Sequence, residues 1–116
     1  MVTLDVSNKL LTRIAQVSKD SLAEYCRRWL VVELALFGSV LRDDFGPESD
    51  VDVLVTFAPD ADWSLFDHVK MAEELKALFK REVDLVSRRA VERSQNWIRR
   101  KNILNSAQVV YAARQR

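Results

Sequence analysis

The sequence predicts an α/β (α+β) fold in which helices flank a small mixed β-sheet, and it predicts a single domain over residues 1–116. Three observations lead to this fold class. Apolar runs of strand length, rich in β-branched residues, occur at 31–37, 51–57 and 82–87. Segments with apolar residues at helical spacing alternate with these runs. The segment between the second and third runs has the length of a parallel crossover, so this pair of strands is expected to be parallel.

Composition limits the classes of protein to consider. The chain has 116 residues, of which 48% are apolar and 30% charged, and this length is enough to build one hydrophobic core. No apolar run approaches the roughly 18 residues of a membrane-spanning helix, and the N-terminus lacks a secretion pattern, so the cytoplasm is the expected compartment. The one cysteine, Cys26, excludes an internal disulfide and is expected to be a small apolar residue on a helix.

The N-terminal part predicts two helices before the first strand. Residues 8–17 place apolar side chains at helical spacing, and DSLAEYCRRWL (residues 20–30) continues as a second helix or as a bent extension of the first. The two strands that follow are joined by a loop that contains both glycines of the chain, Gly38 and Gly46. This loop is longer than a tight hairpin needs.

A capped helix is predicted between the second and third strands. Ser64 and Asp67 have the spacing of a capping box, and the helix that they open is expected to end near Arg81. The apolar stripe expected along this helix consists of Leu65, Val69, Ala72, Leu75 and Phe79.

The C-terminal part predicts one helix over residues 91–104 and a short closing strand over 107–112. Trp97, Ile98 and Leu104 are the core contacts expected of this helix.

Three further side chains are expected to have structural roles. Trp29 is expected in the core. Trp63, in the loop after the second strand, is expected to pack rather than to stack on a nucleobase. His68, the only histidine, is expected to be a surface or packing residue, since no nucleophile motif accompanies it.

Two aspartates separated by one residue stand at the start of the second strand. Alternate residues of a strand point to the same face, so Asp50 and Asp52 share one face and the valines between and after them share the other. Asp84 lies in the third strand, within VDLV. If that strand runs parallel beside the second, its carboxylate joins the same acidic face.

Such a group of acids needs compensation. Two unit charges about 4 Å apart repel by roughly 4 kcal/mol at an effective dielectric constant near 20. The acids can stay apart and hydrated, one of them can be protonated, or a cation can lie between them. A hard divalent ion is the usual resolution, and Mg²⁺ suits two or three carboxylates with positions left for water and phosphate.

The first glycine points to a phosphate ligand for such an ion. Gly38 follows the first strand directly and begins a turn with Ser39. The backbone amides of this turn can approach a phosphate closely because Gly38 has no side chain in the way, and Ser39 adds a hydroxyl group. A phosphate cradle opposite a metal held by carboxylates is the minimum equipment for phosphoryl or nucleotidyl transfer.

These residues resemble a known motif. GSVLRDDFGPESDVD (residues 38–52) resembles the G-S, ten residues, D-x-D motif of the DNA polymerase beta-type nucleotidyltransferase superfamily, and VDLV resembles the strand of its third acid. The resemblance covers residues 31–111 and is strongest to the minimal nucleotidyltransferases (MNT proteins) of bacteria and archaea. It implies the nucleotidyltransferase fold. It also implies an antitoxin that transfers AMP from ATP to a tyrosine of a partner HEPN ribonuclease, the toxin, in a hetero-oligomer.

The resemblance assigns roles to the matching residues. Gly38 and Ser39 would hold the triphosphate of ATP. Asp50 and Asp52 would bind the Mg²⁺ ions, and Asp84 would complete a second metal site and help to deprotonate the attacking hydroxyl group.

Two further residues of the loop can be compared with the family pattern. Arg42 fits the family pattern, and it is expected either to contact a phosphate or to form a salt bridge with a nearby acid. Asp43 departs from the glycine of many relatives, which concerns the shape of the loop but not the acidic site.

The charge distribution is uneven. Residues 43–84 have twelve Asp or Glu against four Lys or Arg, whereas residues 88–116 have eight Lys or Arg against one Glu. The basic part includes Arg99, Arg100 and Lys101, for which a solvated helix face is expected, with contacts to nucleotide phosphates or to a partner as the alternative. A dedicated nucleic-acid surface is not expected.

Two other functions stay open. The chain could silence its partner by binding alone, with an idle metal site. It could also be a nucleotidyltransferase for a small molecule such as an aminoglycoside, although related enzymes usually carry an extra substrate domain.

Overall fold

The computed structural model describes residues 3–4, 14 and 17–114. The helix expected over residues 8–17 therefore lies outside the described residues, except for Ile14, which is buried in the core, and Val17, which packs against it. One strand was not expected: β1 (Thr3–Leu4) pairs antiparallel with the last strand.

The sheet is mixed, as predicted, and has the order β1-β5-β2-β3-β4. Strands β2 (Val31–Phe37) and β3 (Val51–Phe57) have the predicted bounds and pair antiparallel. β4 (Val83–Ser87) runs parallel to β3, and β5 (Gln108–Arg114) pairs antiparallel with β2. The predicted βαβ crossover from β3 to β4 is confirmed.

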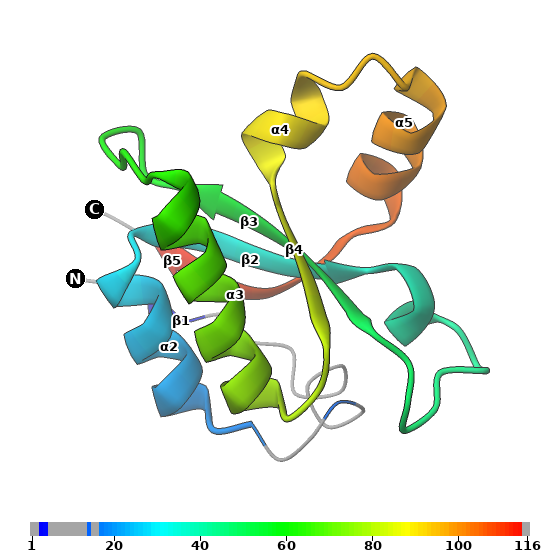
Figure 1. Ribbon diagram of the computed structural model, residues 1–116, viewed down its shortest axis with the longest axis horizontal. Helices are drawn as coiled ribbons and strands as arrows, with labels where there is room; N and C mark the ends of the chain where they lie inside the picture. Colours follow the sequence, from blue (N-terminus) through cyan, green and yellow to red (C-terminus); the bar gives the residue numbers. More distant parts are fainter. Residues whose placement is uncertain (1–2, 5–13, 15–16, 115–116) are drawn as a thin grey trace.

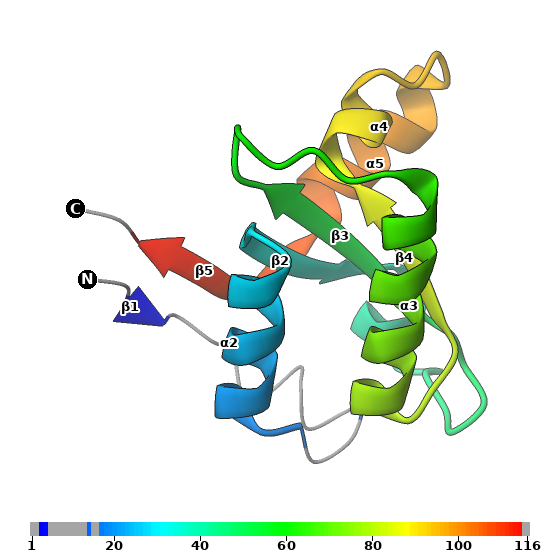
Figure 2. The ribbon, with the colours of Figure 1, turned by 60° about the vertical axis from the view of Figure 1, so that its left-hand side comes forward.

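Two helices cover one face of this sheet. α2 (Lys19–Arg28) begins after Ser18, whose hydroxyl group accepts the first backbone N–H groups of the helix. α3 (Leu65–Phe79) begins with the predicted capping box of Ser64 and Asp67. α2 and α3 lie side by side and run in opposite directions (Figure 1, Figure 2).

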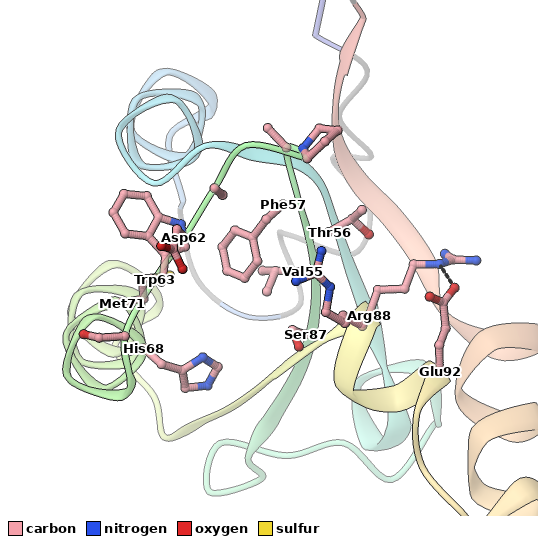
Figure 3. Close-up of a pocket in the computed structure, with 15 residues that line it drawn as sticks. Val55, Thr56, Phe57, Asp62, Trp63, His68, Met71, Ser87, Arg88 and Glu92 are labelled. Atoms are coloured by element: carbon pink, nitrogen blue, oxygen red, sulfur yellow. Dashed lines mark hydrogen bonds and ion pairs between the residues drawn. The ribbon is translucent and has the colours of Figure 1, made fainter.

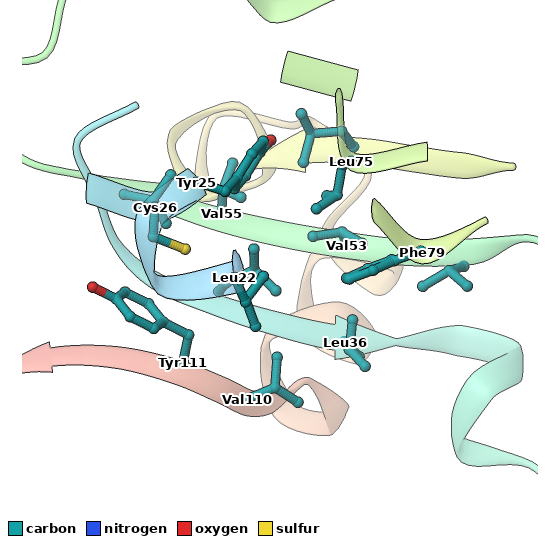
Figure 4. Packing of buried hydrophobic residues seen from close by; sticks show 14 of the residues in the cluster. Leu22, Tyr25, Cys26, Leu36, Val53, Val55, Leu75, Phe79, Val110 and Tyr111 are labelled. Carbon is teal, nitrogen blue, oxygen red and sulfur yellow. The ribbon is translucent and has the colours of Figure 1, made fainter. Parts of the chain in front are cut away.

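The main core lies between these two helices and the sheet. Figure 4 shows side chains of α2 and α3 meeting those of β2, β3 and β5. The hydroxyl group of Tyr25 crosses from α2 to α3 and donates a hydrogen bond to the carbonyl oxygen of Met71 at 3.0 Å. Cys26 is fully buried as an apolar residue, as predicted, and burial raises the pKa of its thiol to about 12. Trp29 is also in this core, as predicted, and Trp63 packs against it edge to face.

The apolar stripe predicted for α3 is wrong at its first turns. Leu65 and Val69 are 80% and 55% exposed, whereas Met71 is completely buried. The inward positions run through His68, whose ring is half-buried and lies 2.9 Å from the carbonyl oxygen of Leu85. A polar residue thus occupies an inward position, and the apolar neighbours on the outer side suggested a different face.

The other face of the sheet is covered by two helices where one was predicted. α4 (Arg88–Glu92) follows the cap residue Ser87, and α5 (Trp97–Ser106) follows the cap residue Asn96. Because the Asn96 side chain accepts the N–H of Arg99, it starts a new helix instead of continuing the old one. Figure 1 shows α4 and α5 together on the side away from α2.

The expected core positions of the last helix are partly wrong. Trp97 and Ile98 are 60% and 57% exposed, because they lie on the first turn of α5. Ile103 is buried, and Leu104 packs beside it, as predicted for Leu104. This smaller core also contains Ala35, Phe37, Leu54 and Val91. None of the helices in the described part of the chain is long and apolar enough to cross a membrane.

Candidate active site

The turn after β2 is built on a glycine in a conformation that other residues rarely adopt. Gly38 begins the short 3₁₀ helix η1 (Gly38–Leu41) and has a φ of +74°. A Cβ atom at this position would collide with Oδ2 of Asp52. Glycine is therefore required twice, for its backbone angle and for the close approach of an acid.

Two of the three predicted acids are partners in the sheet. Asp52 pairs with Phe37 on one side and with Asp84 on the other, where β3 and β4 run parallel. Phe37 belongs to the smaller core, so the acids share the face that α4 and α5 cover farther along. Asp52 is half-buried, whereas Asp50 and Asp84 are exposed.

The pKa of Asp52 reflects its burial and the charged side chains around it. Burial raises the pKa of Asp52 above its usual value, and the charges of Asp84 and then Asp50 raise it further. Arg99 and Arg42 act in the opposite direction. The structure thus brings Asp50 and Asp84 within electrostatic reach of Asp52.

Hydrogen bonds hold the loop that carries Asp50. Ser39 Oγ donates to the carbonyl oxygen of Asp50 at 3.0 Å. Arg81 Nη1 donates to the carbonyl oxygens of Gly46 and Ser49 at 2.7 and 2.8 Å. The Arg81 guanidinium also lies over the ring of Phe45, 4.3 Å from its centre.

Arg81 supports the site but has no recognisable pattern in the sequence. It follows the helix α3 and lies more than 30 positions beyond the loop that it holds, so no local motif contains it. Arg42, the predicted phosphate contact, forms a salt bridge between its Nε and Asp44 Oδ1 at 3.2 Å, which was the stated alternative. Both side chains are exposed.

The acids provide the hard oxygen donors that Mg²⁺ prefers. In the part of the chain that the structure describes, no three Asp, Glu, His or Cys side chains are already grouped as a metal site. Asp52 and Asp84 are nevertheless neighbours in register, and the cost of their repulsion adds to burial, the larger cause, in raising the pKa of Asp52. A cation between them would relieve this cost, so the donor set fits the ion.

Comparison with known proteins decides the family. A family model described as the nucleotidyltransferase domain matches residues 19–110. This chain belongs to the nucleotidyltransferase family. The Protein adenylyltransferase MntA of Thermococcus cleftensis is 35% identical over 92 residues, which is 79% of this chain and 84% of that protein. The predicted membership of the minimal nucleotidyltransferases is confirmed.

Solved structures support the fold of this nucleotidyltransferase. A chain from the crystal structure of a toxin–antitoxin with AMP-PNP has a TM-score of 0.63 and 18% identity, with 83% of this chain and 74% of the other covered. A chain from the complex of tri-AMPylated Shewanella oneidensis HEPN toxin with MNT antitoxin has a TM-score of 0.54 and 19% identity, with 80% and 68% covered.

The nucleotidyltransferase also has a cavity of about 460 Å³ that does not contain the acids. It lies at the other ends of β3 and β4, and Phe57, Trp63 and Arg88 are among the residues around it (Figure 3). Two of the polar groups there have structural partners. Trp63 Nε1 donates to the carbonyl oxygen of Trp29, and Arg88 Nε donates to Glu92. None of the three acids lines this cavity, so it lacks the carboxylates that would hold the metal ion.

Proposed function

We propose that this chain is a magnesium-dependent protein adenylyltransferase that acts in the cytoplasm as an antitoxin. It transfers AMP from ATP to a tyrosine of a HEPN-domain ribonuclease and thereby silences that toxin. The observation that carries this proposal is the contact between the Gly38 backbone and the Asp52 carboxylate, with Asp84 in register beside it. A turn without a side chain next to paired acids is the arrangement that a metal-bound triphosphate needs.

The relatives support the acceptor. The archaeal relative is named a protein adenylyltransferase, and one structural neighbour is an MNT antitoxin in complex with an AMPylated HEPN toxin. The single domain over residues 1–116 would carry all residues of the reaction on this side of the complex.

Each residue of the site would have its own role in the reaction. Gly38, Ser39 and Arg42 would bind the triphosphate, and Asp50 and Asp52 would hold Mg²⁺, which neutralises charge on the phosphates when bound. The tyrosine oxygen attacks the α-phosphorus of ATP, and the bond from that phosphorus to the oxygen that bridges to the β-phosphate breaks. Pyrophosphate leaves with that oxygen. Asp84, exposed at the site, would complete the metal site and accept the phenolic proton.

Mass spectrometry tests this proposal directly. The protein is incubated with Mg²⁺, ATP and a HEPN-domain protein from the same genome, and the HEPN protein is examined for an adenylyl group on tyrosine. We expect transfer by the wild-type protein and by Asp60→Asn, which changes an exposed acid away from the site. We expect none from Asp50→Asn with Asp52→Asn.

The same variants separate the alternatives. A protein that silences its partner by binding alone would still protect cells from the toxin after both substitutions. Transfer to a small molecule but not to the HEPN protein would contradict the proposed acceptor. Absence of any nucleotide transfer or nucleotide binding by the wild-type protein would contradict the enzymatic function itself.

A further inference from the structure

A second cavity, of about 300 Å³, lies between α4 and α5 next to the acids. Val86 in its wall is two residues beyond Asp84 on the same strand, so both side chains point to the same face. Two residues of a strand span about 7 Å. The cavity therefore begins about the length of a ribose away from the acidic site.

The cavity has an apolar floor and a basic rim. Val86, Val91 and Ile103 line its floor, and Val91 and Ile103 are each 5% exposed. Arg99 and Arg100 lie at its rim. A volume near 300 Å³ with apolar walls and a few polar groups is typical of a small-molecule site.

The two arginines of the rim differ in their bonding. Arg100 Nη1 donates to the carbonyl oxygen of Ser94 at 3.0 Å and so holds the turn between the two helices. Among the described residues, the Arg99 guanidinium forms no salt bridge. The chain contains no Asp or Glu after Glu92, so no nearby acid on α5 competes for it.

Arg99 also lies within reach of the acids. Its charge lowers the pKa of Asp52, against the combined effects of burial and the other two acids. Arg99 thus lines the cavity and lies near Asp52, and it is a cation that an anionic ligand can bind.

We propose that the cavity between α4 and α5 is the nucleoside subsite of the active site, and that Arg99 binds the phosphates of the nucleotide. The base lies against Val86 and Ile103, and the phosphates extend past Arg99 to the acids. This inference rests on the proposed function and adds to it the place of the base and a phosphate ligand outside the family motif.

The cavity of about 460 Å³ is a poorer place for the base. Its residues on β3 begin at Val55, three positions beyond Asp52, which corresponds to about 10 Å along the strand. Val55 also points to the main core, on the face opposite the acids. A nucleotide with its phosphates at Asp52 would have to extend farther along the strands to reach this cavity than to reach the one between α4 and α5.

Three variants and two ligands test the subsite. Ala90 is exposed and lines the cavity, so Ala90→Phe fills the cavity without removing a core residue. Arg99→Gln removes the charge, and Lys101→Gln removes a neighbouring charge outside the cavity. The dissociation constants of Mg-ATP and of Mg-tripolyphosphate, which lacks the nucleoside, are measured by isothermal titration calorimetry, with the Tm of each variant as a control for folding.

We expect the wild-type protein to bind Mg-ATP more tightly than Mg-tripolyphosphate. Ala90→Phe should erase this difference and leave tripolyphosphate binding unchanged. Arg99→Gln should weaken binding of both ligands about tenfold, the size expected for one charge-assisted hydrogen bond. Lys101→Gln should behave like the wild-type protein.

The results that would overturn the inference are distinct from those that overturn the function. If Asp52→Asn abolishes binding of both ligands while Ala90→Phe and Arg99→Gln bind as the wild-type protein does, the subsite is elsewhere and the function stands. If the wild-type protein binds neither ligand, both proposals fail.

Discussion

Gly38 joins the conformation of the chain to the chemistry of the site. Its positive φ turns the chain out of β2, and its missing side chain leaves room for the Asp52 carboxylate. Gly46, in the same loop, has neither constraint, since a Cβ atom there would have no neighbour within 4 Å. The two glycines therefore allow a matched comparison.

We expect Gly38→Ala to lower the free energy of unfolding by about 1–3 kcal/mol and to abolish binding of Mg-ATP. Strain at the positive φ and the collision with Asp52 both contribute. Gly46→Ala should raise stability slightly, by roughly 0.5 kcal/mol, because it restricts the unfolded chain. Urea unfolding and calorimetry measure both effects. Equal behaviour of the two variants would contradict the role given to Gly38.

The charge of Asp52 opposes folding in the absence of a cation. Its pKa in the folded protein is raised from 3.8, so the folded state holds its proton more tightly than the unfolded state does. The resulting stability is fully present below pH 3.8 and is lost as the pH rises through the raised pKa. At neutral pH the ionised carboxylate is destabilising.

Asp52→Asn should therefore raise the Tm of the metal-free protein at pH 7, by roughly 2–5 °C, while it abolishes transfer of AMP. The gain should disappear as the pH falls below 4, because Asp52 in the wild-type protein is then protonated. Thermal unfolding in EDTA across this pH range measures the difference. A lower Tm for Asp52→Asn at pH 7 would show that the carboxylate stabilises the fold instead.

The strands of this protein could be predicted from the sequence better than its helices. β2 and β3 are buried on both faces along most of their length, so each appears as a mainly apolar run with clear ends. The parallel pairing of β4 with β3 followed from the length of the crossover, and it placed Asp84 beside Asp52. These local features were sufficient to find the three acids.

Which face of a helix is buried, and where a helix is interrupted, depends on contacts that the sequence does not display. The inward face of α3 contains His68, which a search for apolar spacing passes over. The break between α4 and α5 depends on Asn96 and on the hydrogen bond from Arg100 to Ser94, and neither has a strong local pattern. Trp97 was therefore expected in the core, whereas the buried residue of α5 is Ile103.

The loop that carries Asp50 depends on a residue outside the motif. Arg81 Nη1 donates to two carbonyl oxygens of this loop while its Nε donates to the carbonyl oxygen of Ile14 at 3.3 Å, and a lysine has only one nitrogen for these two places. We expect Arg81→Lys to lower the free energy of unfolding by about 1–2 kcal/mol and to lower kcat about tenfold, because Asp50 is less firmly placed. Stability and AMP transfer are measured in parallel.

Arg88→Lys is the control for that substitution. Arg88 is bound to Glu92 on the surface, and loss of such a pair changes stability by roughly 0.5 kcal/mol or less. Its AMP transfer should equal that of the wild-type protein. If Arg81→Lys also retained full kcat, the loop would hold Asp50 without its help.

The site as a whole exists only when α5 has packed on the sheet beside the acids. The end of β2 supplies Gly38, two parallel strands supply Asp52 and Asp84, and α5 on the smaller core supplies Arg99. Arg99 is 47 positions from Asp52 in the chain, so its relation to the acids appears only in the folded molecule. The family motif identifies the acids, and the fold adds the cations around them.

Binding of Mg-ATP should consequently stabilise the whole fold. A ligand at about 100 times its dissociation constant adds roughly 2.7 kcal/mol to the free energy of unfolding when it binds only the folded state. We expect Mg²⁺ with a non-hydrolysable ATP analogue to raise the Tm by several degrees, and EDTA to reverse this effect. The increase should grow as the pH rises through the raised pKa of Asp52, because the ionised carboxylate is the form that binds the ion. Asp52→Asn should remove both the increase and its pH dependence, whereas Asp60→Asn should retain them. An increase of the same size in Asp52→Asn would place the bound ion away from these acids.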